Sequence, residues 1–396
     1  MLFYLKYFNH DVEKLHELIS FFFEKVEKEK PVAFTTSLLP AWYSATVNRL
    51  EKLETQLTHF LTLSEKEKTA IIKAFSDGNR IDTLFSNKTK RYAHIPVASD
   101  FKKHNADGSF DNTIEVFLNE LFVDNLYTGQ LGKKDSTFSK KIGSHLGNHF
   151  TGLKDNHSIS NEDFSLCPFC GIEPIKMINS EGRPDYDHLL PKGDSLFVFS
   201  SINLKNLVPI GDHCNGKKSS QHLLYSDKNR TARTISFYPF EPTPNPCELY
   251  NFELVCKEYP DYSNLWKGEW EVKIKPNVSS NRRITDKIKT WDRVFNIKNR
   301  YEEYLKIHGK SMIDKILRTM DSSSADLLIE LKSELNNLLR KRYLYEYIFI
   351  STEEGLIPKR ILIEWCLKDE NYLLNYLNFK KTFPTAPINV NSQMFE

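Results

Sequence analysis

The sequence has almost no excess of charge of either sign and no long apolar run. Its 54 Lys and Arg residues against 52 Asp and Glu residues leave a net charge of +2, so a nucleic-acid surface would be a local basic patch and not a property of the whole chain. No stretch approaches the roughly 20 apolar residues of a membrane helix, and the N-terminus lacks the basic and apolar regions of a signal peptide. These absences predict a cytoplasmic protein that does not enter a membrane.

Other familiar architectures are also missing. The sequence shows no internal repeat, and neither a helix-turn-helix nor an array of zinc fingers can be identified in it. Cysteine is sparse, with six residues at positions 167, 170, 214, 247, 256 and 366. Because a CxxC pair in an intracellular protein indicates a metal site before a disulfide, Cys167 and Cys170 are candidate metal ligands.

Helical periodicity dominates both ends of the chain. Ser64 and Glu67 have the spacing of a capping box at the start of a helix. Residues 88–112 predict a loop or irregular strands, and the polar segment 143–165 has little periodicity, so we expect a domain edge near Asp155. Apolar residues recur at helical spacing in 11–29, about 40–63, 113–126 and 325–347.

Short strands are expected between the helical ends. Three segments alternate apolar and polar residues, at 234–240, 252–256 and 270–275. The sequence therefore predicts an α+β fold in three parts. These are a helical N-terminal region for partner or target binding, a central unit, and a C-terminal region of strands followed by helices, over residues 1–155, 156–232 and 233–396.

Three blocks in the central unit carry the chemistry: CPFCG, PDYDHLLPKG and NLVPIGDHCNGKK. Hydrolysis of a phosphodiester near neutral pH needs a divalent metal ion and a base. Asp187 offers a hard oxygen ligand for Mg²⁺ or Mn²⁺, and His188 belongs to the residue type whose pKa of about 6.5 suits deprotonation of water. Asn215 is the best placed second ligand, and it leaves most coordination positions to water and phosphate.

Basic residues accompany these blocks. Lys192 follows the Asp-His step, and Lys217 and Lys218 end the third block. Such side chains can screen phosphates on either side of the metal. They predict that nucleic acid contacts the protein here.

A second, structural metal is predicted at the cysteines. The thiolates of Cys167, Cys170 and Cys214 can share one Zn²⁺, which would hold together a unit with little core of its own. A second knuckle would place a further cysteine at position 211, where the sequence has Gly211. The fourth ligand therefore stays open, with His213, His222, Cys247 and Cys256 as candidates.

Taken together, the blocks resemble the HNH endonuclease family, in which a two-stranded hairpin packs on a helix around one catalytic metal. The resemblance implies that Asp187 is a metal ligand and His188 the general base. It implies that Asn206, in the string NLVPI, fixes the hairpin loop and the orientation of the histidine, and that Asn215 is the second metal ligand. DHLLPKG, NLVPI and CNxxK are similar to the zinc-bearing branch often found in bacterial defence and restriction proteins.

The resemblance leads us to expect a ββα-metal nuclease domain over residues 156–232 that hydrolyses DNA, most naturally double-stranded, with Mg²⁺ or Mn²⁺. By analogy with the family, the protein would be an effector of an antiphage or restriction system, controlled by a partner such as an ATPase or by self-association. Two alternatives stay open. One is a ribonuclease with the same site, since nothing in the motif reads the 2′-hydroxyl, and the other is a non-catalytic zinc-bound interaction module.

Overall fold

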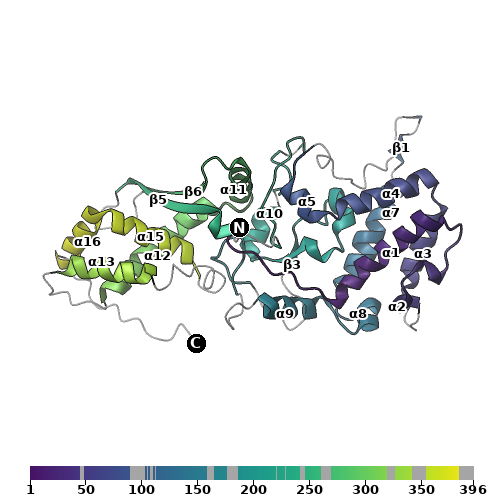
Figure 1. The fold of residues 1–396 in the computed structure, drawn as a ribbon, viewed down its shortest axis with the longest axis horizontal. Coiled ribbons are helices and arrows are strands. Elements are labelled where there is room, and N and C mark those ends of the chain that lie inside the picture. Colours follow the sequence, from purple (N-terminus) through teal and green to yellow (C-terminus); the bar gives the residue numbers. More distant parts are fainter. Residues whose placement is uncertain are drawn as a thin grey trace.

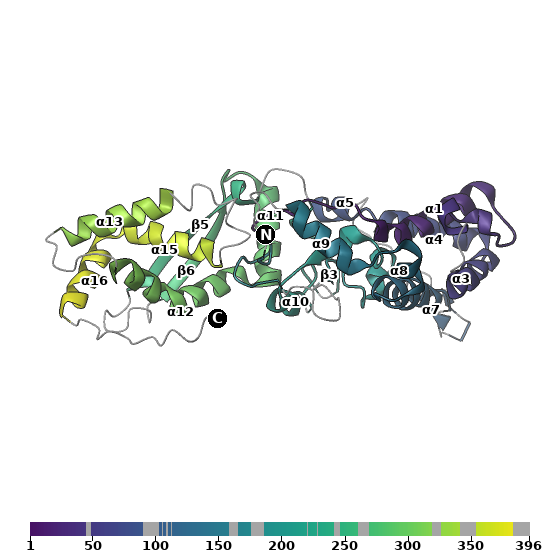
Figure 2. The ribbon, with the colours of Figure 1, turned by 90° about the horizontal axis from the view of Figure 1, so that it is seen from below.

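The protein is an elongated α+β molecule with helices at both ends (Figures 1 and 2). The computed structural model describes residues 1–44, 49–89, 103–104, 106–107, 110–111, 113–157, 165–175, 186–219, 221–227, 229–240, 246–259, 269–318, 326–340 and 354–382. Three two-stranded antiparallel sheets occur in these ranges. None of the described helices combines the length and the apolar character that crossing a bilayer requires.

The N-terminal helices form where apolar periodicity predicts them. They are α1 (Lys14–Glu29), α2 (Ala41–Ser44), α3 (Glu51–Thr62), α4 (Glu65–Gly78) and α5 (Ile81–Ser86), with 3-10 turns at η1 (Asp11–Glu13) and η2 (Thr36–Leu38). The predicted capping box is confirmed: the Ser64 side chain accepts from the Glu67 N–H, and the Glu67 carboxylate accepts from the Ser64 N–H. The predicted span 40–63 is divided between α2 and α3, and residues 45–48 lie outside the described residues.

One expectation for this half is wrong. The polar segment 143–165 contains a helix, α9 (Leu146–His157), which runs through the domain edge expected near Asp155. Its Leu146, Phe150 and Leu153 are buried at helical spacing, a stripe that the surrounding Asn, His and Gly residues conceal. The other helical segments here are α7 (Thr113–Asn119), the π-helical η4 (Glu120–Leu131) and α8 (Thr137–Ile142).

The centre of the molecule holds a small hairpin and a helix. Strand β3 (Tyr186–His188) pairs antiparallel with β4 (Leu207–Pro209), and α10 (Asp212–Ser219) follows directly. The connection between the strands contains two 3-10 turns, η5 (Ser195–Ser200) and η6 (Leu204–Asn206). The order is therefore strand, strand, helix within one short stretch of chain.

The C-terminal part packs helices against one longer hairpin. The predicted strands at 252–256 and 270–275 are confirmed as β5 (Tyr250–Glu258) and β6 (Glu269–Pro276), paired antiparallel. The predicted strand at 234–240 is wrong, because this extended segment makes single backbone bonds, such as Ser236 N–H to Phe85 C=O, and no ladder. The helices are α11 (Arg282–Phe295), α12 (Ile297–Arg318), α13 (Leu327–Leu338), α15 (Leu356–Lys368) and α16 (Glu370–Thr382), with a 3-10 turn at η7 (Pro246–Glu248).

Some expected elements fall partly outside the described residues. Of the predicted helix at 325–347, α13 covers the middle, and residues 341–347 are not described. Of the predicted irregular segment 88–112, the described part includes the short pair β1 (Lys103–His104) and β2 (Phe110–Asp111).

The central hairpin is buried between two hydrophobic cores. Val198, Phe199 and Leu207 belong to the core of the N-terminal helices, whereas Phe197 and Val208 belong to the core that contains the C-terminal elements. Residues next to each other in the chain, such as Leu207 and Val208, therefore point into different cores. The apolar side chains of the hairpin fasten it to both halves of the molecule, which fixes its position.

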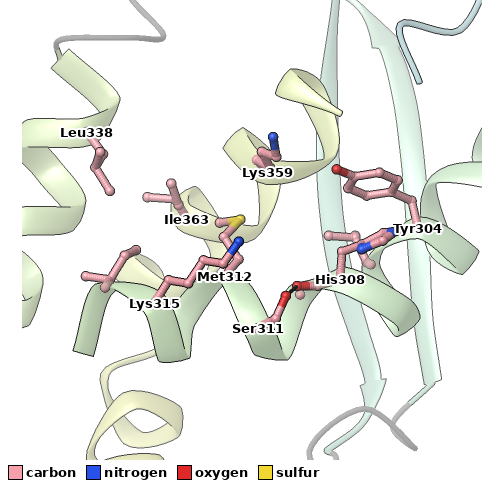
Figure 3. Close-up of a pocket in the computed structure, with 11 residues that line it drawn as sticks. Tyr304, His308, Ser311, Met312, Lys315, Leu338, Lys359 and Ile363 are labelled. Carbon is pink, nitrogen blue, oxygen red and sulfur yellow. Dashed lines mark hydrogen bonds between the residues drawn. The ribbon is translucent and has the colours of Figure 1, made fainter. Parts of the chain in front are cut away.

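A cavity of about 370 Å³ lies in the C-terminal part, between α12, α13 and α15 (Figure 3). Its wall combines apolar side chains such as Met312 and Ile363 with the basic side chains of His308, Lys315 and Lys359. The cavity shares no residue with the three motif blocks, so the motif has to be sought in the hairpin and α10.

Candidate functional site

Asp187 and His188 end the strand β3. The register pairs Asp187 with Val208 and His188 with Leu207, and the Leu189 N–H then donates to the Asn206 C=O over 2.8 Å. The Asp-His step therefore stands at the end of a hairpin strand, one residue before the loop begins. The helix α10 follows the partner strand β4 in the chain, and Figure 1 shows β3 and α10 in the middle of the molecule.

Asn206 joins the two ends of the hairpin loop. Its side chain is fully buried. Its Oδ1 accepts from the Leu190 N–H over 2.8 Å, and its Nδ2 donates to the carbonyls of Leu190 and Ser200, each over 3.1 Å. These bonds hold the chain after His188 against the chain that leads into β4.

The His188 imidazole is fixed in one tautomer. Its Nε2 lies 2.8 Å from the Ser201 carbonyl oxygen, and because a carbonyl can only accept, Nε2 donates and Nδ1 keeps its lone pair. The His188 side chain is 3% exposed. The Tyr127 ring packs edge-on against the imidazole, with the two ring centres 4.5 Å apart. Burial lowers the pKa of His188 to about 3, so the ring is neutral at pH 7.

Lys218 links α10 to the Asp-His step. Its Nζ lies 2.7 Å from Asp187 Oδ2 and donates to the His188 C=O over 2.7 Å. The Lys218 side chain is 3% exposed and that of Asp187 20% exposed. Lys218 therefore points into the protein, whereas the sequence suggested a lysine that faces phosphates.

The remaining predicted site residues lie at the surface around this pair. Asn215 is exposed and sits one helical turn before Lys218 on α10, so it stands near the residue that holds Asp187. Lys217 is exposed as well. The half-buried Lys192 places its Nζ 4.9 Å from the centre of the Tyr127 ring, at cation–π distance.

The three motif cysteines form a buried group that could bind a metal ion. The Sγ atoms of Cys167, Cys170 and Cys214 lie within 4.8 Å of one another, and sulfurs that share one tetrahedral Zn²⁺ with bonds of about 2.3 Å lie about 3.8 Å apart. The knuckle is tight, since the N–H groups of Cys170 and Gly171 both donate to the Cys167 C=O. Gly171 has φ +61°, a conformation that glycine adopts without strain.

The thiols of this group are electrostatically coupled to a buried arginine. Burial raises the pKa of Cys167 and of Cys214. Burial also opposes ionisation of Cys170, but hydrogen bonds from Cys167 and Cys214 and the charge of Arg300 lower its pKa overall. Arg300, on α12, donates to Cys214 Sγ over 2.9 Å and to Glu173 Oε1 over 2.5 Å.

The fourth-ligand candidates lie elsewhere. His213 is exposed and lies outside the cysteine group, and the His222 ring faces the Asp194 carboxylate at 3.8 Å. Cys256 sits on β5, where its thiol donates to the Glu258 C=O. The side chain of Cys247 lies outside the described residues.

The motif did not indicate four residues that complete these sites. Tyr127 and Ser201 contact the His188 ring, and Glu173 and Arg300 contact Cys214. Glu173 lies six residues after Cys167, just beyond the CPFCG block. An acidic residue so close to a knuckle that lacks its fourth cysteine is a sequence feature from which Glu173 could have been predicted. Tyr127, Ser201 and Arg300 meet the motif residues only in the folded structure, so the sequence motif does not indicate them.

Comparison with protein-family models, with curated proteins and with solved structures found no match for this chain. The functional argument therefore depends on the residues and their geometry.

Proposed function

We propose that the protein is an HNH-type endonuclease that hydrolyses DNA phosphodiester bonds with a divalent metal ion. The observation that carries the proposal is the arrangement of β3, β4 and α10, because it brings Asp187, His188 and α10 to one place through the Lys218 bridge. The proposal keeps the cytoplasmic location and the role in DNA defence or restriction that the sequence suggested, with a partner such as an ATPase or self-association.

The metal-ligand roles come from the sequence motif, and the contacts of His188 and Asn206 support theirs. Asp187 and Asn215 would hold Mg²⁺ or Mn²⁺ through oxygen atoms, which suits these hard ions. The ion supplies charge stabilisation for the phosphate when bound. His188 would accept a proton from water at Nδ1, because Nε2 is committed to the Ser201 carbonyl. Since burial lowers its pKa to about 3, this role requires water or DNA to enter the site and raise that pKa toward the ordinary value of about 6.5. Asn206 keeps the loop that carries this carbonyl in place.

One observation favours the second candidate, a non-catalytic zinc-bound module. His188 is 3% exposed, and a base has to reach its water. The Tyr127 ring covers the imidazole, so the nuclease requires this ring to move, or water to enter beside it, when DNA binds. The non-catalytic candidate requires neither.

Cleavage assays separate the two candidates and identify the substrate. Purified protein is incubated with plasmid DNA, single-stranded DNA and RNA, in Mg²⁺, Mn²⁺ or EDTA. We expect metal-dependent nicking of DNA, and a loss of about 10²- to 10⁴-fold in His188→Ala, the usual contribution of a general base. His213→Ala is the matched control, since this exposed histidine on α10 lies outside the site. Cleavage that persists in EDTA or in His188→Ala contradicts the mechanism, and cleavage of RNA alone identifies a ribonuclease.

A further inference from the structure

The space beside Gly211 is already filled. A second knuckle would need a cysteine side chain here, at the start of α10. A Cβ atom built on Gly211 would lie 2.3 Å from Glu173 Oε2 and 2.9 Å from Glu173 Cβ, distances that real side chains do not tolerate. The Glu173 carboxylate therefore occupies the volume in which a fourth cysteine would stand.

Glu173 bridges the two pieces of chain that carry the cysteines. Its backbone C=O accepts from the Cys167 N–H over 2.8 Å, which places the residue on the knuckle itself. Its side chain crosses to α10, where Oε2 is 3.3 Å from the Cys214 N–H. A ligand in the fourth position of the group has to span this same gap between knuckle and helix.

Arg300 provides the charge and the orientation that such a ligand needs. Three thiolates and a carboxylate around Zn²⁺ would leave two negative charges in a buried site, which is costly unless a cation is near. Arg300 is 8% exposed and binds Glu173 Oε1 and Cys214 Sγ. The arginine holds Oε1, as outer-shell partners of ligating carboxylates do, and Oε2, which accepts a hydrogen bond from the Cys214 N–H, is the oxygen that would turn toward the metal.

We propose that Glu173 supplies the fourth ligand of a zinc site at Cys167, Cys170 and Cys214, in the position that Gly211 leaves open, with Arg300 as the partner that orients it. Among the described residues, the His222 ring faces Asp194 and the Cys256 thiol donates to the Glu258 C=O, whereas His213, beside Cys214 in the sequence, is exposed. The Glu173 carboxylate stands outside the group of sulfurs within 4.8 Å of one another, so it has to turn inward to reach a metal. The proposal rests on zinc at the cysteines and not on nuclease activity, so it can be tested even if the chain cleaves no nucleic acid.

The first test uses the unaltered protein. Metal analysis should find one zinc per chain, and X-ray absorption at the zinc edge should find three sulfurs at about 2.3 Å and one oxygen at about 2.0 Å. Cobalt-loaded protein should show d–d bands that azide does not shift, because a closed structural site has no exchangeable water. Absence of zinc, four sulfur ligands, or a shift on adding azide to this protein would each overturn the assignment.

The second test removes the carboxylate. Glu173→Gln should lower zinc affinity, measured by chelator competition, by about 100-fold or more, above what outer-shell changes usually cost. Its cobalt form should become sensitive to azide, since water then fills the fourth position. Glu303→Gln is the matched control, because Glu303 is an exposed carboxylate on the same helix as Arg300. If Glu173→Gln binds zinc within tenfold of the parent and ignores azide, Glu173 is not a ligand.

A rescue by cysteine tests the position itself and remains informative if Glu173→Gln folds poorly. Gly211→Cys alone should lower zinc affinity, because the new side chain collides with Glu173. Combined with Glu173→Gly, which removes both clashing atoms, it should restore affinity to within about tenfold of the parent with four sulfurs at the metal. A double variant that binds zinc no better than Glu173→Gln would show that the fourth position lies elsewhere.

Discussion

The cysteine group and the Asp187–His188 hairpin are fastened to the same helix, α10, by two residues one turn apart, and they are built in different ways. Lys218 joins the hairpin through an ion pair with Asp187 and one hydrogen bond to the His188 C=O. Cys214 joins the knuckle through its thiol, in a buried pocket that Arg300 of α12 completes. The strands of the hairpin pair within one short stretch of chain, although Tyr127 and His149 contact its His188 and Tyr186 side chains. The cysteine group depends on Arg300, 86 positions from Cys214.

The two regions differ in how far solvent can reach them. The cysteine group is closed and buried, which suits a metal that stabilises the fold. At the hairpin, the Asp187 side chain is 20% exposed and Asn215 is exposed, so this region is more open to solvent, as the proposed catalytic site requires. Because α10 belongs to both, loss of the buried metal should weaken the whole unit, whereas changes at the rim should affect binding and cleavage more than folding.

The largest effect is expected from Cys167→Ser. Zinc contributes about 10 kcal/mol or more to folding in small zinc units. Because Cys214 of α10 also belongs to a hydrophobic core that holds the unit without metal, we expect a smaller loss, of at least about 4 kcal/mol, in the free energy of unfolding. Urea denaturation and zinc content measure it. Cys256→Ser, at a half-buried thiol on β5, is the control and should change neither. Unchanged zinc content in Cys167→Ser would show that the metal, if any, is elsewhere.

Next in size is the charge that links α10 to the hairpin. Lys218→Met leaves Asp187 without its partner, and truncation of one member of a buried ion pair costs about 3 to 5 kcal/mol. We expect about 3 kcal/mol, the lower end, because Asp187 keeps some contact with solvent. Lys217→Met, at the exposed neighbouring residue, should stay within about 0.5 kcal/mol. If urea denaturation shows the same loss in the free energy of unfolding for Lys218→Met and Lys217→Met, the two lysines do not differ in the way that the structure indicates.

A contact between His149 and the hairpin should make the stability of the protein depend on pH. His149 Nδ1 accepts from the Tyr186 hydroxyl at the start of β3, and Nε2 donates to the Phe8 C=O. Burial, together with the charge of nearby His10, lowers the pKa of His149 to about 4. Between pH 6.5 and 4 the unfolded chain then binds the extra proton, so stability is full above pH 6.5 and falls as the pH decreases toward 4.

This loss should amount to about 3 kcal/mol at most for His149. The measurement is the free energy of unfolding against pH, for the parent and for His149→Phe. The variant should be less stable at pH 7 and show a smaller decline between pH 6.5 and 4. A decline equal to that of the parent would mean that the residue carries no such linkage, and that other buried histidines, such as His16, dominate the acid loss.

The hairpin could be predicted from sequence because its information is local. The Asp-His step, the Asn206 position and α10 lie within a few dozen residues, and their pairing needs no distant partner. The capping box at Ser64 was predictable for the same reason. The sequence does not predict helix α9, because its apolar stripe is thin. It predicts a strand at 234–240, because alternation indicates burial on one side without supplying a strand to pair with.

The cysteine group shows where sequence reasoning stopped. The three thiols were predicted, and they do meet. The sequence could not reveal that Glu173 fills the volume beside Gly211, because this depends on how the knuckle packs against the start of α10. Nor could it reveal that Arg300 reaches Cys214, because this depends on how α12 packs against α10. The burial of Lys218 was hidden in the same way, since adjacent lysines in a helix differ only in the direction they face.

The smallest expected effect concerns DNA binding and compares the buried Lys218 with the more exposed Lys192 and Lys217. Each lysine that contacts a phosphate releases a counterion, so its removal should lower the slope of log K against log salt by about one. Binding of a DNA fragment is measured in the cleavage-impaired His188→Ala background at several salt concentrations. Lys192→Gln and Lys217→Gln should each reduce the slope and weaken binding severalfold, whereas Lys218→Gln should leave the slope unchanged because its charge is paired with Asp187. If Lys218→Gln reduces the slope as the others do, the lysine turns outward when DNA binds, and α10 then holds the hairpin only in the free protein.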